Sequence, residues 1–212
     1  MTWVVGMPTP FGAAVAVSDV RVTWSDGTSA DCLRKVYPVH RNMACGISGS
    51  VELGFHMLDD LARYLAAIPV GCVPLPAVMT WRWWRRARRI YASAPAEHRC
   101  GGCSLMILGV SPALNKGIPW PRSYVAVLRA SSFQPEFLRG FNWCGSIGSG
   151  GGVEEYRKAI EGQNFSLLQA AVGSNRLGFE IAQALGLRLH FTLRERRDRG
   201  VSDDLLADSR SN

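Results

Sequence analysis

The 212-residue sequence contains no apolar run of the roughly 18–20 residues that a membrane-spanning helix needs. Its first residues lack the basic segment of a secretory signal, and Pro8 and Pro10 interrupt the apolar stretch there. Without an export signal, the six cysteines are expected to be reduced thiols. These absences argue against a membrane protein and against a disulfide-stabilised secreted domain, and they predict a cytoplasmic location.

Motifs for metals and nucleotides are also scarce. Cys100-Gly101-Gly102-Cys103, with His98 beside it, is half of a zinc-ligand pattern, but no second Cys/His pair follows at a suitable spacing. The glycine-rich turn Gly148-Ser149-Gly150 lacks the GxGxxG spacing and the early βαβ setting of a dinucleotide site. We therefore expect no metal and no cofactor.

Composition and length indicate one globular domain. Apolar residues make up 47% of the chain and charged residues 19%, an ordinary balance for a protein with a packed core. A chain of this length can bury one sizeable core, whereas two full domains would be a tight fit. The formal net charge of +7 permits an anionic partner, such as nucleic acid or a membrane surface, but does not require one.

The predicted secondary structure alternates between groups of strands and groups of helices. Apolar runs and turn signals predict strands over 2–7, 13–18, 20–24, 33–38, 43–47, 103–110, 123–129 and 143–149. Helical periodicity predicts helices that begin at 51 and 77, with further helices over 153–161, 166–171 and 177–187. This segregated order favours an α+β fold in which sheets pack face to face beneath outer helical layers.

The most informative residue is Thr2, which directly follows Met1 at the head of an apolar segment. Methionine aminopeptidase removes an initiator methionine when the next side chain is small, so the mature chain is expected to begin with a free threonine. The pKa of such an α-amine is about 7.7–8.0. The amine can therefore take the proton from the hydroxyl of the same residue, and Thr2 fits a nucleophile that carries its own general base.

Four further residues fit an acyl-transfer site around such a nucleophile. Lys35 follows Asp19 by sixteen residues, and a lysine held by an aspartate lowers the pKa of a nearby hydroxyl and amine. The turn before the first helix exposes unpaired N–H groups, which makes the Gly49 amide a candidate donor to an oxyanion. Ser149, in the glycine-rich turn Gly148-Ser149-Gly150, is a candidate to relay the proton of the α-amine.

Taken in order, these segments resemble a β-subunit of the proteasome family, in particular its bacterial HslV branch. Each segment is unspecific alone, but five in this order and spacing are specific, and the resemblance extends over roughly residues 2–187. The segments are the Thr2 strand, Ser18-Asp19, Leu33-Arg34-Lys35-Val36-Tyr37, Gly46-Ile47-Ser48-Gly49-Ser50 and Ile147-Gly148-Ser149-Gly150-Gly151.

The resemblance implies a four-layer αββα sandwich of the N-terminal nucleophile hydrolase type, formed by residues 1–193 with Met1 removed. It also implies a threonine-type endopeptidase that cleaves unfolded polypeptides inside a double ring of identical subunits, either a dodecamer or a tetradecamer. An AAA+ unfoldase as a further partner is left open. The implied site consists of Thr2 as nucleophile and base, Lys35 as the cation, Asp19 as its partner, Gly49 as the oxyanion donor and Ser149 beside the amine.

The polar tail over residues 194–212 departs from the family pattern. Members of the family have a last strand that brings an aspartate and a serine toward the α-amine. Here no convincing apolar strand follows residue 193, and the candidate replacements, Asp198 and Ser202, have a spacing one residue longer than the pattern. The tail is therefore interpreted as a truncated or degenerate last strand, and an open sheet edge would be a liability.

The segment Trp81–Arg89 supports a competing hypothesis. Aromatic side chains interleaved with arginines can stack on bases and neutralise phosphates, or seat a helix on a membrane surface. In the resembling fold this segment forms the second helix, so its tryptophans are expected in the core or against a neighbouring subunit. We favour a solvated or subunit-contact surface over nucleic acid. The alternative is an inactive structural or binding protein of the same fold that contacts nucleic acid through this helix.

Overall fold

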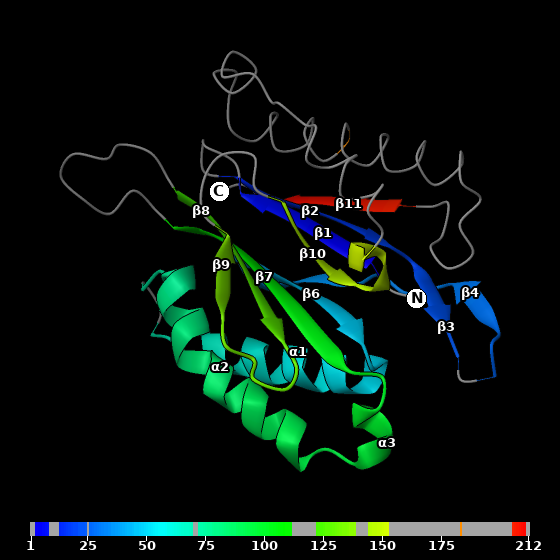
Figure 1. Cartoon of the computed structure of the whole chain (residues 1–212). Coiled ribbons are helices and arrows are strands. Elements are labelled where there is room, and N and C mark those ends of the chain that lie inside the picture. Colours follow the sequence, from blue (N-terminus) through cyan, green and yellow to red (C-terminus); the bar gives the residue numbers. More distant parts are fainter. Residues whose placement is uncertain are drawn as a thin grey trace.

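A computed structural model of the chain describes residues 3–8, 13–24, 26–69, 72–111, 122–138, 144–152, 183 and 205–210. Strands, helices and further strands follow one another as the sequence predicts (Figure 1). The helices are α1 (Val51–Ala66), α2 (Pro76–Ser93), α3 (Ala96–Arg99) and the 3-10 helix η1 (Ser149–Gly152). The strands are β1 (Trp3–Pro8), β2 (Ala14–Asp19), β3 (Arg21–Thr23), β4 (Ser29–Asp31), β5 (Val36–His40), β6 (Met43–Gly49), β7 (Cys103–Ser111), β8 (Arg122–Arg129), β9 (Glu136–Leu138), β10 (Gly145–Gly148) and β11 (Leu205–Arg210).

The central element is a five-stranded antiparallel sheet with the order β5-β6-β7-β8-β9. Its middle strands are nearly continuous apolar runs because both faces of the sheet are covered. Alternate side chains of a strand point to opposite faces. In β6, Met43, Cys45 and Ile47 join the cluster on the helical side, whereas Ala44 joins the cluster on the other side.

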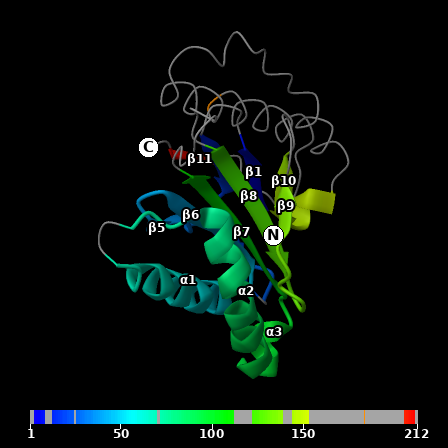
Figure 2. The same cartoon turned by 90° about the vertical axis from the view of Figure 1, so that its left-hand side faces the viewer.

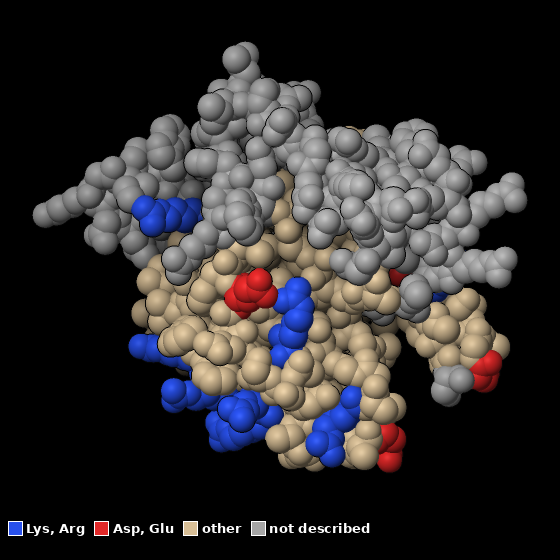
Figure 3. Space-filling view, viewed as in Figure 1, with Lys and Arg blue, Asp and Glu red and all other residues tan. Residues whose placement is uncertain are grey.

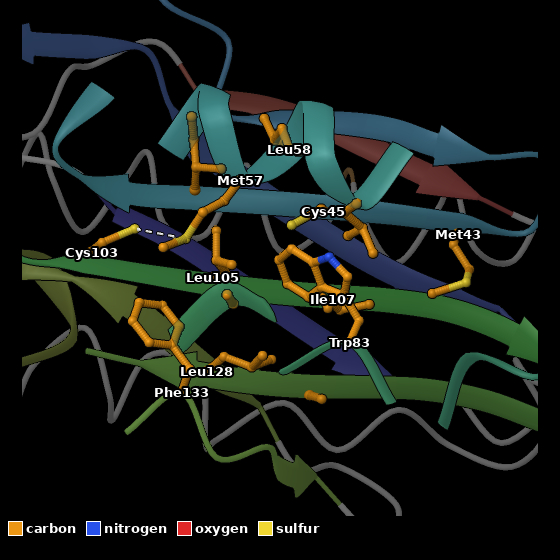
Figure 4. Close-up of a cluster of buried hydrophobic side chains, with 14 of the residues drawn as sticks. Met43, Cys45, Met57, Leu58, Trp83, Cys103, Leu105, Ile107, Leu128 and Phe133 are labelled. Atoms are coloured by element: carbon orange, nitrogen blue, oxygen red, sulfur yellow. Dashed lines mark hydrogen bonds between the residues drawn. The ribbon is translucent and has the colours of Figure 1, made fainter. Parts of the chain in front are cut away.

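Helices α1 and α2 cover one face of this sheet (Figure 2). The N-terminus of α1 is capped by the Ser50 hydroxyl, which accepts a hydrogen bond from the N–H of Leu53 at 3.4 Å. Trp83 of α2 is fully buried among the side chains of this layer (Figure 4). Its indole N–H donates to Asp60 of α1 at 2.8 Å, so the two helices are joined by a satisfied polar contact within the core.

A four-stranded antiparallel sheet with the order β10-β1-β2-β11 covers the other face. A second apolar cluster lies between the two sheets, where Val4 and Ile147 of the four-stranded sheet meet Met106 and Val125 of the five-stranded sheet. In the register of this sheet, Trp3 of β1 pairs with Gly148 of β10. The pairing brings the start of β1 beside the glycine-rich turn that follows β10.

The described residues thus form a helical layer and two packed sheets, and the fold is α+β. The helices predicted over 153–161, 166–171 and 177–187 lie outside the described residues, so the fourth layer of the αββα sandwich stays a prediction. Among the described helices, none is long and apolar enough to span a membrane.

The structure corrects the sequence-based elements in three places. The polar tail contains β11, which pairs in an antiparallel fashion with β2, whereas the sequence predicts no strand there. The short elements β4, β9 and α3 are also not predicted. On α1, the apolar residues that recur at the helical period are only partly buried, because Val51 and Phe55 are exposed while Leu58, Leu61 and Leu65 are in the core.

Candidate active site

Asp19 and Lys35 form a buried ion pair that joins the two sheets. Asp19 is the last residue of β2, and Lys35 directly precedes β5. The Lys35 ammonium donates to Asp19 Oδ1 at 2.6 Å and to the backbone oxygen of Arg21. The backbone oxygen of Lys35 in turn accepts a hydrogen bond from the N–H of Ile47 at 2.9 Å, which holds this residue beside β6. Two of the three N–H donors of the ammonium are therefore engaged.

Burial controls the electrostatics of this pair, since the Lys35 and Asp19 side chains are only 2% and 0% exposed. Burial lowers the pKa of Lys35 from its ordinary value, and the Asp19 carboxylate opposes that shift. Burial likewise raises the pKa of Asp19, against the opposing charge of Lys35. Each charge is thus buried only because the other accompanies it.

Asp19 also holds the beginning of β1. Its Oδ1 accepts a hydrogen bond from the backbone N–H of Trp3 at 2.9 Å. That N–H belongs to the peptide bond between Thr2 and Trp3. Asp19 therefore binds the backbone at the residue that directly follows Thr2 in the sequence. Thr2 itself lies outside the described residues.

Gly49 is the last residue of β6 and stands directly before the N-terminal cap of α1. Its φ of +91° is readily adopted only by glycine, and a Cβ at this position would lie 2.4 Å from the carbonyl oxygen of Gly102. The same oxygen accepts a hydrogen bond from the N–H of Ser50 at 2.9 Å. This turn is therefore packed against the segment that leads into β7.

Ser149 begins η1 directly after β10, and its side chain is exposed. The next residue, Gly150, lies against the indole of Trp3, because a Cβ there would be 2.5 Å from the ring. Glycine is thus required for the turn to approach β1 this closely. The turn that carries Ser149 consequently packs on the residue that follows Thr2.

Gly49 and Ser149 line the same cleft, whose volume of about 1080 Å³ can admit a segment of polypeptide. A small recess beside Gly49 is lined by Lys35 as well. The wall of the cleft is completed by residues that the sequence did not indicate, among them Trp24, Glu97 and Arg129. These residues come from the β3–β4 hairpin, α3 and β8, and since they are far apart in the sequence, no local motif could have identified them.

The two cysteines of the half zinc pattern, Cys100 and Cys103, have different surroundings. Cys103 is buried at the start of β7, and burial raises the pKa of its thiol to about 12. Its Sγ contacts Met57 Sδ at 3.8 Å (Figure 4). Cys100 is exposed, and its thiol donates to the backbone oxygen of Glu97 at 2.8 Å. Within the described part of the chain, no group of three or more His, Cys, Asp or Glu side chains is placed to hold a metal ion.

The architecture has a close counterpart among solved structures. The crystal structure of eukaryotic HslV from Trypanosoma brucei matches with a TM-score of 0.63, and the match covers 99% of each chain. This chain has the HslV fold. The sequence identity of the match is 12%, so the likeness concerns the fold alone. No protein-family model matches the sequence, and neither does any curated protein.

Of the five predicted site residues, the four that the structure describes lie in one region of the HslV fold. Asp19 and Lys35 are in contact, and Gly49 and Ser149 line the adjoining cleft. The candidate replacements in the tail, Asp198 and Ser202, lie outside the described residues together with Thr2. The arrangement around the start of β1 combines a buried lysine and glycine-rich turns, which are groups suited to acyl transfer.

Proposed function

We propose that the protein is a threonine-type endopeptidase of the N-terminal nucleophile hydrolase class, with Thr2 as its nucleophile after removal of Met1. The observation that carries this proposal is the buried Lys35–Asp19 pair. Its aspartate accepts a hydrogen bond from the backbone N–H of Trp3, the residue next to Thr2. A buried lysine is costly to retain for stability alone, since an apolar replacement of an ion pair is often neutral or stabilising. Its place beside the start of β1 favours a chemical role.

In the proposed reaction, Thr2 Oγ attacks the carbonyl carbon of the scissile peptide bond, and the α-amine of Thr2 accepts the hydroxyl proton through a water molecule. The third N–H of the Lys35 ammonium, which is not engaged by Asp19 or Arg21, is the donor that stabilises the developing alkoxide of Thr2. The ammonium formed at the N-terminus then gives its proton to the leaving amine. An ester acyl-enzyme remains, and water hydrolyses it to free the second product and restore the hydroxyl.

The two glycine-rich turns supply the remaining roles. Gly49 ends its strand in the cleft, and we assign its N–H as the donor to the oxyanion of the tetrahedral intermediate. Ser149 lies on the turn that packs against Trp3, and we assign its hydroxyl to the relay that moves the proton of the α-amine. Both assignments rest on the place of each residue around the cleft.

We further propose that residues 1–193, with β11 of the tail added at the edge of β2, form the four-layer αββα domain and that identical subunits assemble into stacked rings. The support is the HslV fold, which matches over nearly the whole chain. Enclosed sites would restrict cleavage to unfolded polypeptides, because folded proteins could not enter. An AAA+ unfoldase is the corresponding candidate partner.

The proposal is tested by intact mass followed by reaction with a peptide epoxyketone, which requires both the hydroxyl and the free α-amine of an N-terminal threonine. The expected result is loss of the Met1 mass and the gain of one inhibitor mass per subunit. Thr2→Ala should gain none, whereas Thr23→Ala, which removes a threonine that lines the cleft, should react as the wild type does. A protein that lacks Met1 and forms no adduct would overturn the proposal and favour an inactive protein of the same fold.

A further inference from the structure

The outer surface of α2 carries an unusual concentration of positive charge. The helix contains five arginines and no acidic residue. Arg82, Arg85, Arg88 and Arg89 are exposed to solvent, and we refer to these four, together with Trp81, as the α2 arginine surface. Figure 3 shows a group of positively charged side chains over the part of the molecule that α2 forms, besides others elsewhere on this face.

Among the described residues, neighbouring carboxylates do not neutralise the charges of this surface. Arg86, the fifth arginine, pairs with Asp60 at 2.7 Å. Within the described part of the chain, no ion pair joins any of the four arginines of the α2 arginine surface to an acidic side chain. Four cations on neighbouring turns repel one another. Binding of an anionic partner to this surface would relieve the repulsion and lower the free energy.

Trp81 adds an aromatic platform to the same surface. Its side chain is 52% exposed, although Trp84 and Phe137 hold its ring at centroid distances of 6.4 and 6.2 Å. The guanidinium of Arg85 lies 5.5 Å from the ring centre of Trp84. The Trp81 ring is therefore fixed in place before any partner binds, with one large part of its surface open for stacking.

The spacing of the arginines along α2 is suited to the phosphates of a nucleic-acid backbone. Arg82, Arg85 and Arg89 follow at helical spacings of three and four, and they cover about 10 Å along the helix axis. Each strand of a DNA duplex carries about three phosphates over such a length of helix axis, so the row of arginines can contact several consecutive phosphates. A membrane surface fits less well, because Trp83 and Ala87 on the apolar side of α2 are buried in the core and cannot enter lipid.

We propose that the α2 arginine surface binds single-stranded nucleic acid, with the arginines on phosphates and Trp81 stacked on an unpaired base. This assignment reverses the preference drawn from the sequence, where the tryptophans are expected in the core or at a subunit contact. Trp83 is in the core, but Trp81 is exposed and directly precedes the exposed arginines along the helix. Arginine and stacked aromatic rings are the combination that sequence-tolerant single-strand binding uses.

Fluorescence anisotropy of a labelled oligothymidylate, and of a duplex of the same length, tests this proposal on the full-length protein over a range of salt concentrations. The variant Arg82→Gln/Arg85→Gln/Arg89→Gln should bind at least about tenfold more weakly, and the slope of log affinity against log salt should decrease in magnitude by about 2. Trp81→Ala should weaken single-strand binding on the order of tenfold and duplex binding little.

Two matched controls keep the experiment decisive. Arg41→Gln/Arg99→Gln/Arg122→Gln removes the same number of exposed arginines elsewhere, and Trp24→Ala removes a tryptophan that is 47% exposed on the β3–β4 hairpin. Both should leave the affinity within about twofold of wild type. Equal losses in the control and α2 variants would overturn the proposal. So would binding to anionic lipid vesicles that depends on the α2 arginines while the oligonucleotide does not bind.

Discussion

Replacement of Lys35 by methionine separates the structural cost of the buried ion pair from its proposed chemical role. Lys35→Met keeps an unbranched side chain that is one atom shorter but removes the only cation that contacts the Asp19 carboxylate among the described residues. Among the described residues, Asp19 Oδ2 already has no hydrogen-bond partner, and Oδ1 would keep only the N–H of Trp3. The variant would thus leave a carboxylate buried without its counter-charge.

The expected loss follows from the burial of both groups. Breaking a buried pair by removing one partner costs about 3–5 kcal/mol, because the remaining charge loses compensation. Replacing both partners is far less harmful, so the double variant Lys35→Met/Asp19→Asn should recover most of that loss. Asparagine is the matched choice at position 19, because its carbonyl oxygen can still accept the hydrogen bond from the Trp3 N–H.

Urea denaturation at one fixed subunit concentration measures these differences as shifts of the midpoint, and the epoxyketone reaction measures the chemistry. We expect Lys35→Met to be strongly destabilised and the double variant to be nearly as stable as the wild type. Neither variant should form the inhibitor adduct. A stable single variant, or a double variant as unstable as the single one, would refute the electrostatic argument; adduct formation by the double variant would refute the role of the lysine.

Two further predictions concern Gly49 and Asp60. Gly49→Ala should lower stability by about 1–2 kcal/mol, because φ is +91° and the added Cβ would collide with Gly102, and thermal melting should show it. Epoxyketone labelling of the folded variant should also slow, since the turn that carries the proposed oxyanion donor must shift. Asp60→Asn should cost about 2 kcal/mol in urea denaturation at neutral pH, because it removes the charge that Arg86 binds. Burial alone would raise the pKa of Asp60, but hydrogen bonds from Arg86 and Trp83 hold it below its ordinary value of 3.8. The wild-type advantage should therefore be complete above about pH 5 and should vanish as the pH falls through the lowered pKa; a difference that persists in acid would contradict this account.

Much of the fold could be predicted from local patterns. β1, β2 and β6–β8 are apolar runs bounded by turn signals, and α1 and α2 follow the helical period, so each is readable within its own segment. β4 and β9 escape prediction because they are only three residues long and owe their structure to pairing with β3 and β8. β11 escapes it because only its first three residues are apolar and it becomes a strand by adding to the edge of β2.

By itself, the sequence determined the order of the elements and the candidates Thr2, Asp19, Lys35, Gly49 and Ser149, since their residue types and spacing are visible in one dimension. The tertiary structure alone decided that Asp19 and Lys35 meet in a water-excluded position between two sheets, that Trp24 and Arg129 close the same cleft, and that Trp81 faces solvent while Trp83 fills the core. The physical reason is that burial and distance depend on how sheets and helices pack, whereas periodicity reports only which face of an element is apolar.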